Sequence, residues 1–270
     1  MTESKSKRKR NTKNNQGRIL KNTSKNKLYL EPTKEKKCNQ REQILFTLTH
    51  FYKHYYNKPE LKIIVSRFNE NLDWLSPLNP NTLIYNKGTS LFLKNEKRLR
   101  NVGRESHTYL HYIIKNYHQL PEYVIFTQGK ISDHVTGEYA FLMKIAEEAI
   151  SFSQSRPKLV KNNQSGSWSP NFNLSMSEFK NYPYKDNHVI PFKEWFLENI
   201  YPRYPQELLI YKNAIFAVSK QRILSRPLSY YQKLITFLDY HINPIEGHFM
   251  ERSWYYIFSQ SIRVPSRLLS

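Results

Sequence analysis

The sequence is poor in cysteine and has no long apolar run. Cys38 is the only cysteine among 270 residues, so a disulfide within the chain and a zinc site built on several cysteines are both excluded. No stretch of about 18 apolar residues occurs, which argues against a helix that spans a bilayer. We therefore expect a soluble protein, and a reducing compartment is consistent with its composition.

Acidic residues are also scarce, since 22 Asp and Glu stand against 42 Lys and Arg, for a net charge of +20. Residues 1–40 hold thirteen Lys or Arg and three acids, which is half of that charge. Like charge with few apolar residues cannot offset the entropy lost when a backbone becomes ordered. We expect residues 1–40 to form a disordered basic arm and residues 41–270 to form a single α/β domain.

The arm begins with a basic cluster, Lys5-Ser6-Lys7-Arg8-Lys9-Arg10. Such clusters are typical of nuclear-localisation signals and nucleic-acid patches, although a merely solvated tail has the same composition. The arm contains no apolar segment of the kind found in signal peptides. We expect an intracellular protein of the cytoplasm or nucleus, with nucleic acid or an import receptor as the candidate partner of the arm.

Apolar periodicity predicts the order of the elements in the rest of the chain. Short apolar runs indicate strands at 61–65, 82–85, 123–127 and 214–218. Apolar spacings of three and four indicate helices at 41–56, 105–120, 139–152, 192–200, 228–241 and 249–259. This alternation predicts a mostly parallel sheet covered by helices on both faces. Residues 156–184 suit a long loop or lid, in which Trp168 is a candidate for stacking on a sugar or a base.

Polar residues follow each predicted strand, where ligands bind in open α/β sheets. They are Ser66, Arg67, Asn69 and Glu70; Asn86, Lys87 and Gly88; Gln128, Lys130, Asp133 and His134; and Ser219, Lys220, Gln221 and Arg222. Each group holds at least one cation, so their convergence would attract a polyanion such as a nucleotide diphosphate. The alternative is that polar residues simply cap the strands.

A further candidate anion site precedes the helix predicted at 105–120. Asn101, Gly103 and Arg104 lie there, and a glycine followed by the free amides of a first helical turn lets an anion approach closely. Ordinary capping, with Glu105 complementing the helix dipole, explains the same residues.

Two histidines four residues apart, His107 and His111, share one face of that helix and could in principle bind a metal. No Glu follows His107 in the metalloprotease pattern, so we expect a partly buried histidine stripe that extends towards His118. We expect Trp254, Tyr255 and Phe258 to be core residues.

Several segments, in order from Leu61 to Phe258, together resemble one family. They are Ile63–Glu70 with Trp74, Ile84–Gly88, Asn101–Tyr109, Phe126–Gly129 with Asp133 and His134, and Glu251–Trp254. The family comprises uncharacterised microbial, fungal and viral proteins and is similar to glycosyltransferases of the GT-A type. The resemblance implies a Rossmann-like (GT-A-like) sheet that binds a nucleotide sugar. It places the base near the end of the first strand and the diphosphate or sugar near Asn101–Glu105.

The chain departs from the GT-A pattern at the metal site. Most enzymes of that type hold a divalent metal with an Asp-x-Asp motif after a central strand, where this chain has Gln128-Gly129-Lys130. Asp133 and His134 could bind Mn²⁺ or Mg²⁺ together with substrate phosphates. Alternatively, Lys130 could replace the charge of the metal on the leaving diphosphate.

Transfer of a sugar to a hydroxyl calls for a general base, and Glu251 is the candidate, near the predicted start of the last helix. A surface role that complements the helix dipole is the alternative for this residue, and Asp239 and Glu246 are the alternative candidates for the base. The sequence thus predicts a glycosyltransferase acting on a nucleotide-sugar donor and an unidentified acceptor. Nucleic-acid binding through the arm, or a catalytically inactive nucleotide-binding pseudoenzyme, are the competing hypotheses. The arm has one aromatic residue, Tyr29, which favours the enzyme because nucleic-acid platforms interleave bases with aromatic rings.

Overall fold

A computed structural model of the chain describes residues 61–75, 81–160, 182–188 and 190–259. The chain divides into two units, Met1–Cys38 and Asn39–Ser270, and the described residues all belong to the second. The predicted basic arm, the predicted helix at 41–56 and Trp168 lie outside the described residues. No helix within the described ranges is long and apolar enough to cross a membrane.

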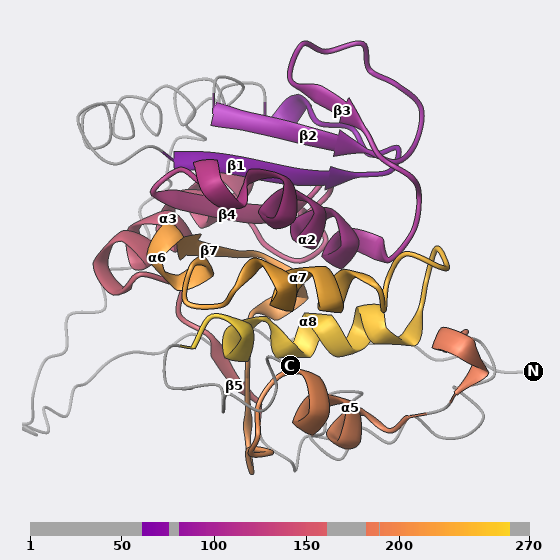
Figure 1. Cartoon of the computed structure of the whole chain (residues 1–270). Coiled ribbons are helices and arrows are strands. Elements are labelled where there is room, and N and C mark those ends of the chain that lie inside the picture. Colours follow the sequence, from indigo (N-terminus) through magenta and orange to yellow (C-terminus); the bar gives the residue numbers. More distant parts are fainter. Residues whose placement is uncertain (1–60, 76–80, 161–181, 189, 260–270) are drawn as a thin grey trace, which may run out of the picture. The chain divides into compact units, whose positions relative to one another are not determined.

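A five-stranded sheet forms the centre of the second unit. Its strands are β1 (Leu61–Arg67), β2 (Thr82–Asn86), β3 (Glu96–Arg98), β4 (Tyr123–Gln128) and β7 (Phe216–Ser219), in the order β3-β2-β1-β4-β7. Strands β1 to β4 pair in parallel, and β7 pairs antiparallel with β4. A second, antiparallel pair joins β5 (Lys158–Val160) to β6 (Leu208–Ile210). The prediction of a mostly parallel sheet is confirmed (Figure 1).

Helices cover both faces of this sheet. They are α2 (Arg104–Asn116), α3 (Glu138–Phe152), α5 (Phe192–Asn199), α6 (Lys220–Ile223), α7 (Leu228–Ile235) and α8 (Ile245–Ile257), with 3-10 turns η2 (Tyr117–Gln119), η3 (Lys185–Asn187) and η4 (Lys212–Ala214). The predicted helix at 228–241 ends early, because the amides of Phe237 and Leu238 bond carbonyls three residues back. The last helix begins at Ile245, directly after Pro244, and not at 249.

The two faces of strand β1 contribute to two separate hydrophobic clusters. Ile63 and Val65 pack in a cluster with residues of α3, while Ile64 belongs to a separate cluster with residues of α2, α7 and α8. Successive side chains of a strand point to opposite faces, so a strand covered on both faces needs a continuous apolar run. This is why the run at 61–65 could be recognised as a strand.

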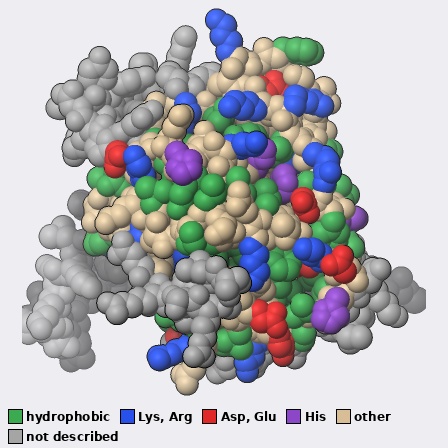
Figure 2. Space-filling view, in the orientation of Figure 1, with side chains coloured by type: hydrophobic (Ala, Val, Ile, Leu, Met, Phe, Trp, Pro, Cys, Tyr) green, Lys and Arg blue, Asp and Glu red, His purple; other side chains and the backbone are tan. Residues whose placement is uncertain are grey.

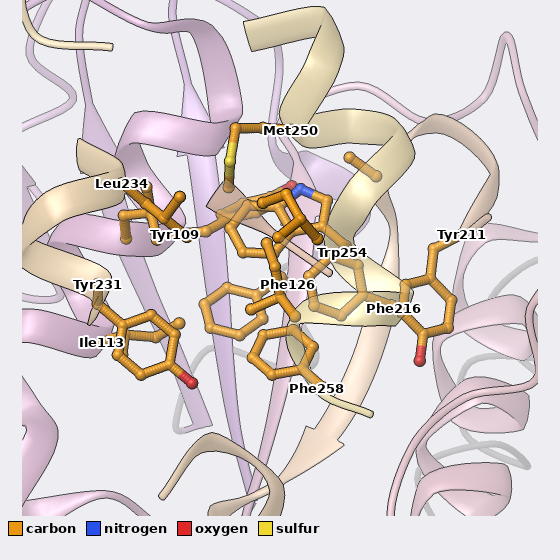
Figure 3. Packing of buried hydrophobic residues seen from close by; sticks show 14 of the residues in the cluster. Tyr109, Ile113, Phe126, Tyr211, Phe216, Tyr231, Leu234, Met250, Trp254 and Phe258 are labelled. Atoms are coloured by element: carbon orange, nitrogen blue, oxygen red, sulfur yellow. The ribbon is translucent and has the colours of Figure 1, made fainter. Parts of the chain in front are cut away.

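An aromatic cluster fixes α8 against α2 and the sheet (Figure 3). The ring centroid of Tyr109 on α2 lies 4.9 Å from that of Phe126 on β4 and 5.8 Å from that of Trp254 on α8. Phe216 on β7 lies 5.4 Å from Trp254. Trp254 and Phe258 are fully buried, as predicted. The same packing places the polar first two turns of α8 beside the first turn of α2.

The parallel strands define where a ligand would bind. From β1 the chain runs to β2 and β3 on one side, and α2 then carries it back to β4 on the other side. Strand order reverses at this point, and open α/β sheets bind ligands in the crevice beyond it. The Oγ of Ser66 at the end of β1 lies 2.9 Å from Oγ1 of Thr108, which holds the start of α2 at this edge.

One predicted strand end does not belong to this edge. In the antiparallel register Ser219 pairs with Tyr123, the first residue of β4, and the amide of Lys220 donates to the carbonyl of Glu122. Ser219–Arg222 therefore lies at the opposite edge, and the prediction that four strand ends converge is wrong for this one. Turn η4 explains the reversal: Gln128 at the end of β4 donates to the carbonyl of Asn213, so β7 has to run back.

Candidate functional site

The side chains that end β1 and β2 bond mainly to one another. The Nε of Arg67 donates to the carbonyl of Glu70 at 2.9 Å, and its Nη1 donates to Asn86 Oδ1 and to the carbonyl of Thr89. Asn86 is fully buried and donates to Glu96 Oε1 at 2.5 Å. Arg67 and Asn86 therefore shape the loops at this edge, and Arg67 as a whole is 5% exposed.

The loop after β1 is locked to the loop after β2. Asn69 Oδ1 accepts from the amide of Thr89 at 2.9 Å, and Glu70 Oε2 accepts from the amide of Phe68 at 2.6 Å. A Cβ on Gly88 would lie 1.5 Å from the carbonyl oxygen of Phe68, so no other residue fits there without moving the backbone. These residues give the edge a defined shape.

The loop that follows β4 is held close to the end of β1 and to the loop that follows it. The amide of Gly129 donates to the carbonyl of Ser66 at 2.8 Å, and its own carbonyl accepts from Trp74 Nε1 at 2.9 Å. A Cβ on Gly129 would lie 2.7 Å from Glu70 Oε2, so the carboxylate of Glu70 rests against this glycine. The carboxylate of Glu70, on the loop after β1, therefore lies beside the backbone of the loop after β4.

Lys130, Asp133 and His134 form an exposed group on the loop that follows. Lys130 Nζ lies 3.5 Å and His134 Nε2 lies 3.6 Å from carboxylate oxygens of Asp133. Desolvation acts to raise the pKa of Asp133, but a backbone hydrogen bond and the neighbouring His134 and Lys130 outweigh it, so the pKa is lowered. Within the described ranges no group of three or more His, Cys, Asp or Glu could hold a metal. Asp133 and His134 fit Mn²⁺ or Mg²⁺ only together with ligands such as phosphate oxygens.

Lys87, one residue beyond β2, holds the turn that leads into α2. Lys87 is 8% exposed, and its ammonium donates to the carbonyl of Val102 at 2.6 Å and to the carbonyl of Arg104. Burial lowers the pKa of Lys87 to about 7, against the opposing effect of Glu105. The lysine therefore positions Arg104 and changes charge near neutral pH.

The turn before α2 requires glycine. Gly103 has φ 59°, and a Cβ there would lie 2.5 Å from the carbonyl oxygen of Leu238. Asn101 is half-buried at the head of this turn. Arg104 follows, and its Nη1 lies 2.9 Å from Nε2 of His248 on α8. The side chain of Arg104 is 35% exposed, which leaves it open to an anion.

Two buried carboxylates lie beside Arg104. Glu105 Oε2 is 3.6 Å from Arg104 Nε, whereas Glu105 Oε1 is buried with no hydrogen-bond partner among the described residues. Glu251 is 9% exposed in the second turn of α8, one turn further into the helix than the sequence suggested. Burial and the negative charge of Glu105 raise the pKa of Glu251, while Arg252 and Arg104 act to lower it. Glu251 is therefore a carboxylate whose pKa is raised above its ordinary value.

The nearby histidines are neutral at pH 7. Burial lowers the pKa of His107 and that of His248 to about 3, and neighbouring cations add to the effect. The rings of His107 and His111 stack at 6.2 Å, as predicted for a buried stripe, whereas His118 is exposed.

The structure separates the predicted site residues. Lys87, Gly103, Arg104 and Glu251 come together where α2 and α8 begin. Residues at or after the ends of β1 and β4 form another group, namely Glu70, Gln128, Lys130, Asp133 and His134, and Gln128 is engaged by the carbonyl of Asn213. The remaining residues at the ends of β1 and β2 bond within this edge; they are Ser66, Arg67, Asn69, Asn86 and Gly88. Figure 2 shows charged side chains and histidines gathered on the side towards which β1 and β2 point in Figure 1. Sequence reasoning missed the contribution of His248, because only the packing of α8 on α2 brings it to Arg104.

Fold and site define an α/β protein with a mostly parallel sheet and a charged site at the carboxyl edge of its strands. Residues 62–267 match a family described as "Protein of unknown function (DUF3431)", and the chain belongs to this family. Comparisons with curated proteins and with solved structures find no match. Membership of an uncharacterised family agrees with the expectation from sequence, and the resemblance to GT-A glycosyltransferases stays a prediction.

Proposed function

We propose that this protein is a glycosyltransferase that moves a sugar from a nucleotide-diphosphate donor to an acceptor hydroxyl. One observation carries the proposal: an exposed arginine at a glycine-preceded helix start lies beside a buried carboxylate of raised pKa. The first arrangement suits a diphosphate, and the second suits a general base.

The donor diphosphate would lie at the start of α2. The amides of Gly103 and Arg104 already donate to the carbonyls of His241 and Ile242, so the anion would bond amides further into the first turn of α2. The helix dipole favours negative charge there. Arg104 adds a guanidinium that can hold two phosphate oxygens at once. Lys87 keeps this turn in place through the carbonyls of Val102 and Arg104.

Glu251 would act as the base. It takes the proton of the acceptor hydroxyl while the oxygen bonds to the anomeric carbon, and the bond from that carbon to the diphosphate breaks with its electron pair leaving on phosphate. A raised pKa favours this role, because a base works best when its pKa approaches the operating pH. The burial of Glu251 and the neighbouring Glu105 supply that shift.

Charge on the leaving diphosphate has two candidate partners. Asp133 and His134 would hold Mn²⁺ or Mg²⁺ together with phosphate oxygens, and the ion would then stabilise the leaving group. Alternatively, the ammonium of Lys130 would stabilise the leaving diphosphate without a metal ion. Replacing Asp133 with Asn separates the two, because it should lower the activity that depends on Mn²⁺ only if the ion is held there.

Thermal-shift measurements with a panel of nucleotide sugars, with and without Mn²⁺, test donor binding. We expect at least one donor to raise Tm, the shift to be lost in Arg104→Met and retained in Lys115→Met, an exposed lysine on α2. A ligand at a hundred times its Kd stabilises by about 2.7 kcal/mol, which is readily measured. No stabilisation by any donor would overturn the proposal.

Two further outcomes identify the competing hypotheses. Donor binding without turnover, unchanged in Glu251→Gln, would indicate a pseudoenzyme. Salt-sensitive RNA binding that is lost when residues 1–40 are removed, without donor binding, would indicate a nucleic-acid-binding protein.

A further inference from the structure

A cavity of about 190 Å³ lies beside the first turn of α8, and its lining is distinct from the residues of the donor site. We call it the η3–α8 cavity. Its lining includes Lys185, Asp186, Trp195, Phe237, Glu246 and Phe249. Three turns or helices, η3, α5 and α8, together with the segment after α7, therefore contribute to it.

Polar groups of the cavity lining keep some unused hydrogen-bonding capacity. Glu246 Oε2 accepts from the hydroxyl of Tyr240 at 2.7 Å, its Oε1 accepts from the amide of Lys185 at 3.1 Å, and its own backbone amide also bonds the carboxylate. A carboxylate has about four acceptor positions, so roughly one remains. The ammonium of Lys185 donates to Thr236 Oγ1 at 3.1 Å and keeps further N–H groups available.

Aromatic rings also line the cavity. The ring of Trp195 lies 5.5 Å from that of Phe249 and 5.6 Å from that of Phe237, and Trp195 and Phe249 are each only 1% exposed. Lys185 Nζ stands 5.0 Å from the centroid of the Phe237 ring. The lining therefore combines a fixed carboxylate and ammonium with apolar ring atoms.

We propose that the η3–α8 cavity binds a neutral polyhydroxyl ring, such as a monosaccharide. Hydroxyl groups can donate to Glu246 and Asp186 and accept from Lys185, and the C–H groups of a sugar ring suit the aromatic part of the lining. The volume suits a single ring, since pockets for drug-sized ligands measure roughly 300–1,000 Å³.

Other classes of ligand fit this lining less well. Glu246 and Asp186 repel an anion, and Lys185 already occupies the position over Phe237 that an organic cation would take. An apolar ligand would leave the carboxylate and ammonium without compensation for their lost water.

The cavity itself is inferred without reference to glycosyl transfer, but its use as the acceptor subsite rests on the proposed function. Glu246 precedes Glu251 by five residues on α8, which is about 7.5 Å along the helix axis and about 140° around it. The two side chains therefore leave α8 on different faces. An acceptor would reach Glu251 only through a part of the molecule that extends beyond the ring bound in the cavity.

Saturation-transfer NMR of the full chain with single monosaccharides tests this inference in the absence of any donor. The panel contains glucose, galactose, mannose and N-acetylglucosamine, with inorganic phosphate and tetramethylammonium as competitors. We expect at least one sugar to bind and neither ion to displace it. Loss of one charge-assisted hydrogen bond in Glu246→Gln should weaken binding about ten- to a hundredfold.

A second variant guards against misfolding of the first. Asp186 is exposed at φ 55°, a conformation that Asn also tolerates, so Asp186→Asn keeps the backbone and removes the charge. It should also weaken sugar binding, whereas Glu198→Gln, an exposed change on α5, should not. No binding of any sugar, displacement by phosphate or tetramethylammonium, or equal affinity in all variants would overturn the inference. Sugar binding without stabilisation by any nucleotide sugar would leave the cavity assigned and refute glycosyl transfer.

Discussion

Lys87 provides a sharp test of how the donor site is built. Its ammonium is buried against the carbonyls of Val102 and Arg104, and its pKa falls from 10.5 to about 7. A neutral amine keeps two N–H groups, so both hydrogen bonds survive deprotonation. The perturbation is Lys87→Met, which keeps the volume and removes both the charge and the donors.

The sign of the pH dependence follows from linkage. Below pH 7 Lys87 is protonated in both states, so it contributes no slope. Between pH 7 and 10.5 the unfolded chain binds a proton that the native chain lacks, and stability rises by about 1.4 kcal/mol per pH unit. From pH 7.5 to 9 the free energy of unfolding of the wild type should therefore rise by about 2 kcal/mol relative to Lys87→Met.

Urea unfolding at pH 7.5, 8.25 and 9 measures this difference. This window lies below the range in which tyrosines of the unfolded chain ionise. The exposed Lys115→Met variant is the control and should keep the wild-type slope. A stability difference between the wild type and Lys87→Met that stays constant over the window would refute the account of Lys87 as a neutral, buried donor.

Three further outcomes are expected. Gly103→Ala should lower the free energy of unfolding in urea by at least about 2 kcal/mol, because Ala in a left-handed conformation costs roughly 1–2 kcal/mol and its Cβ would also clash with Leu238. Gly137→Ala should show only the cost of the left-handed conformation, because the nearest neighbour of its Cβ would lie 3.9 Å away. Glu105→Gln should move the acidic limb of the activity–pH profile to lower pH, because a negative neighbour of Glu251 is lost; an unmoved limb would contradict the coupling. Arg67→Met should lower Tm and weaken donor binding through the loops it joins; a Tm equal to that of the wild type would show that its three hydrogen bonds contribute nothing.

Local sequence patterns predicted the elements whose burial follows a regular period along the chain. The run at 61–65 and the apolar stripe at 105–120 became β1 and α2 because burial and period are encoded in adjacent residues. The three-residue strands β3, β5 and β6 were missed, since β3 has the sequence Glu-Lys-Arg and no such pattern.

Strand direction and helix packing could not be predicted in this way. An apolar run such as that of β7 predicts a strand but not the direction in which the strand runs. Here the contact of Gln128 with η4 places the start of β7 at the end of β4, so the two strands are antiparallel. Position relative to strand ends identified Lys87 and Arg104, but it could not show that Arg67 is engaged by Asn86, since a hydrogen-bond partner 19 residues away leaves no local signal. The approach of His248 to Arg104 likewise depends on the aromatic cluster around Trp254.

Release of the nucleoside diphosphate from a nucleotide sugar, measured with and without acceptors, tests the central claim most directly. We predict that the wild type releases it, that Glu251→Gln does so about a hundred- to ten-thousandfold more slowly while still binding the donor, and that Glu198→Gln behaves as the wild type. Equal release by the wild type and Glu251→Gln, or no release from any donor that binds, would contradict the account.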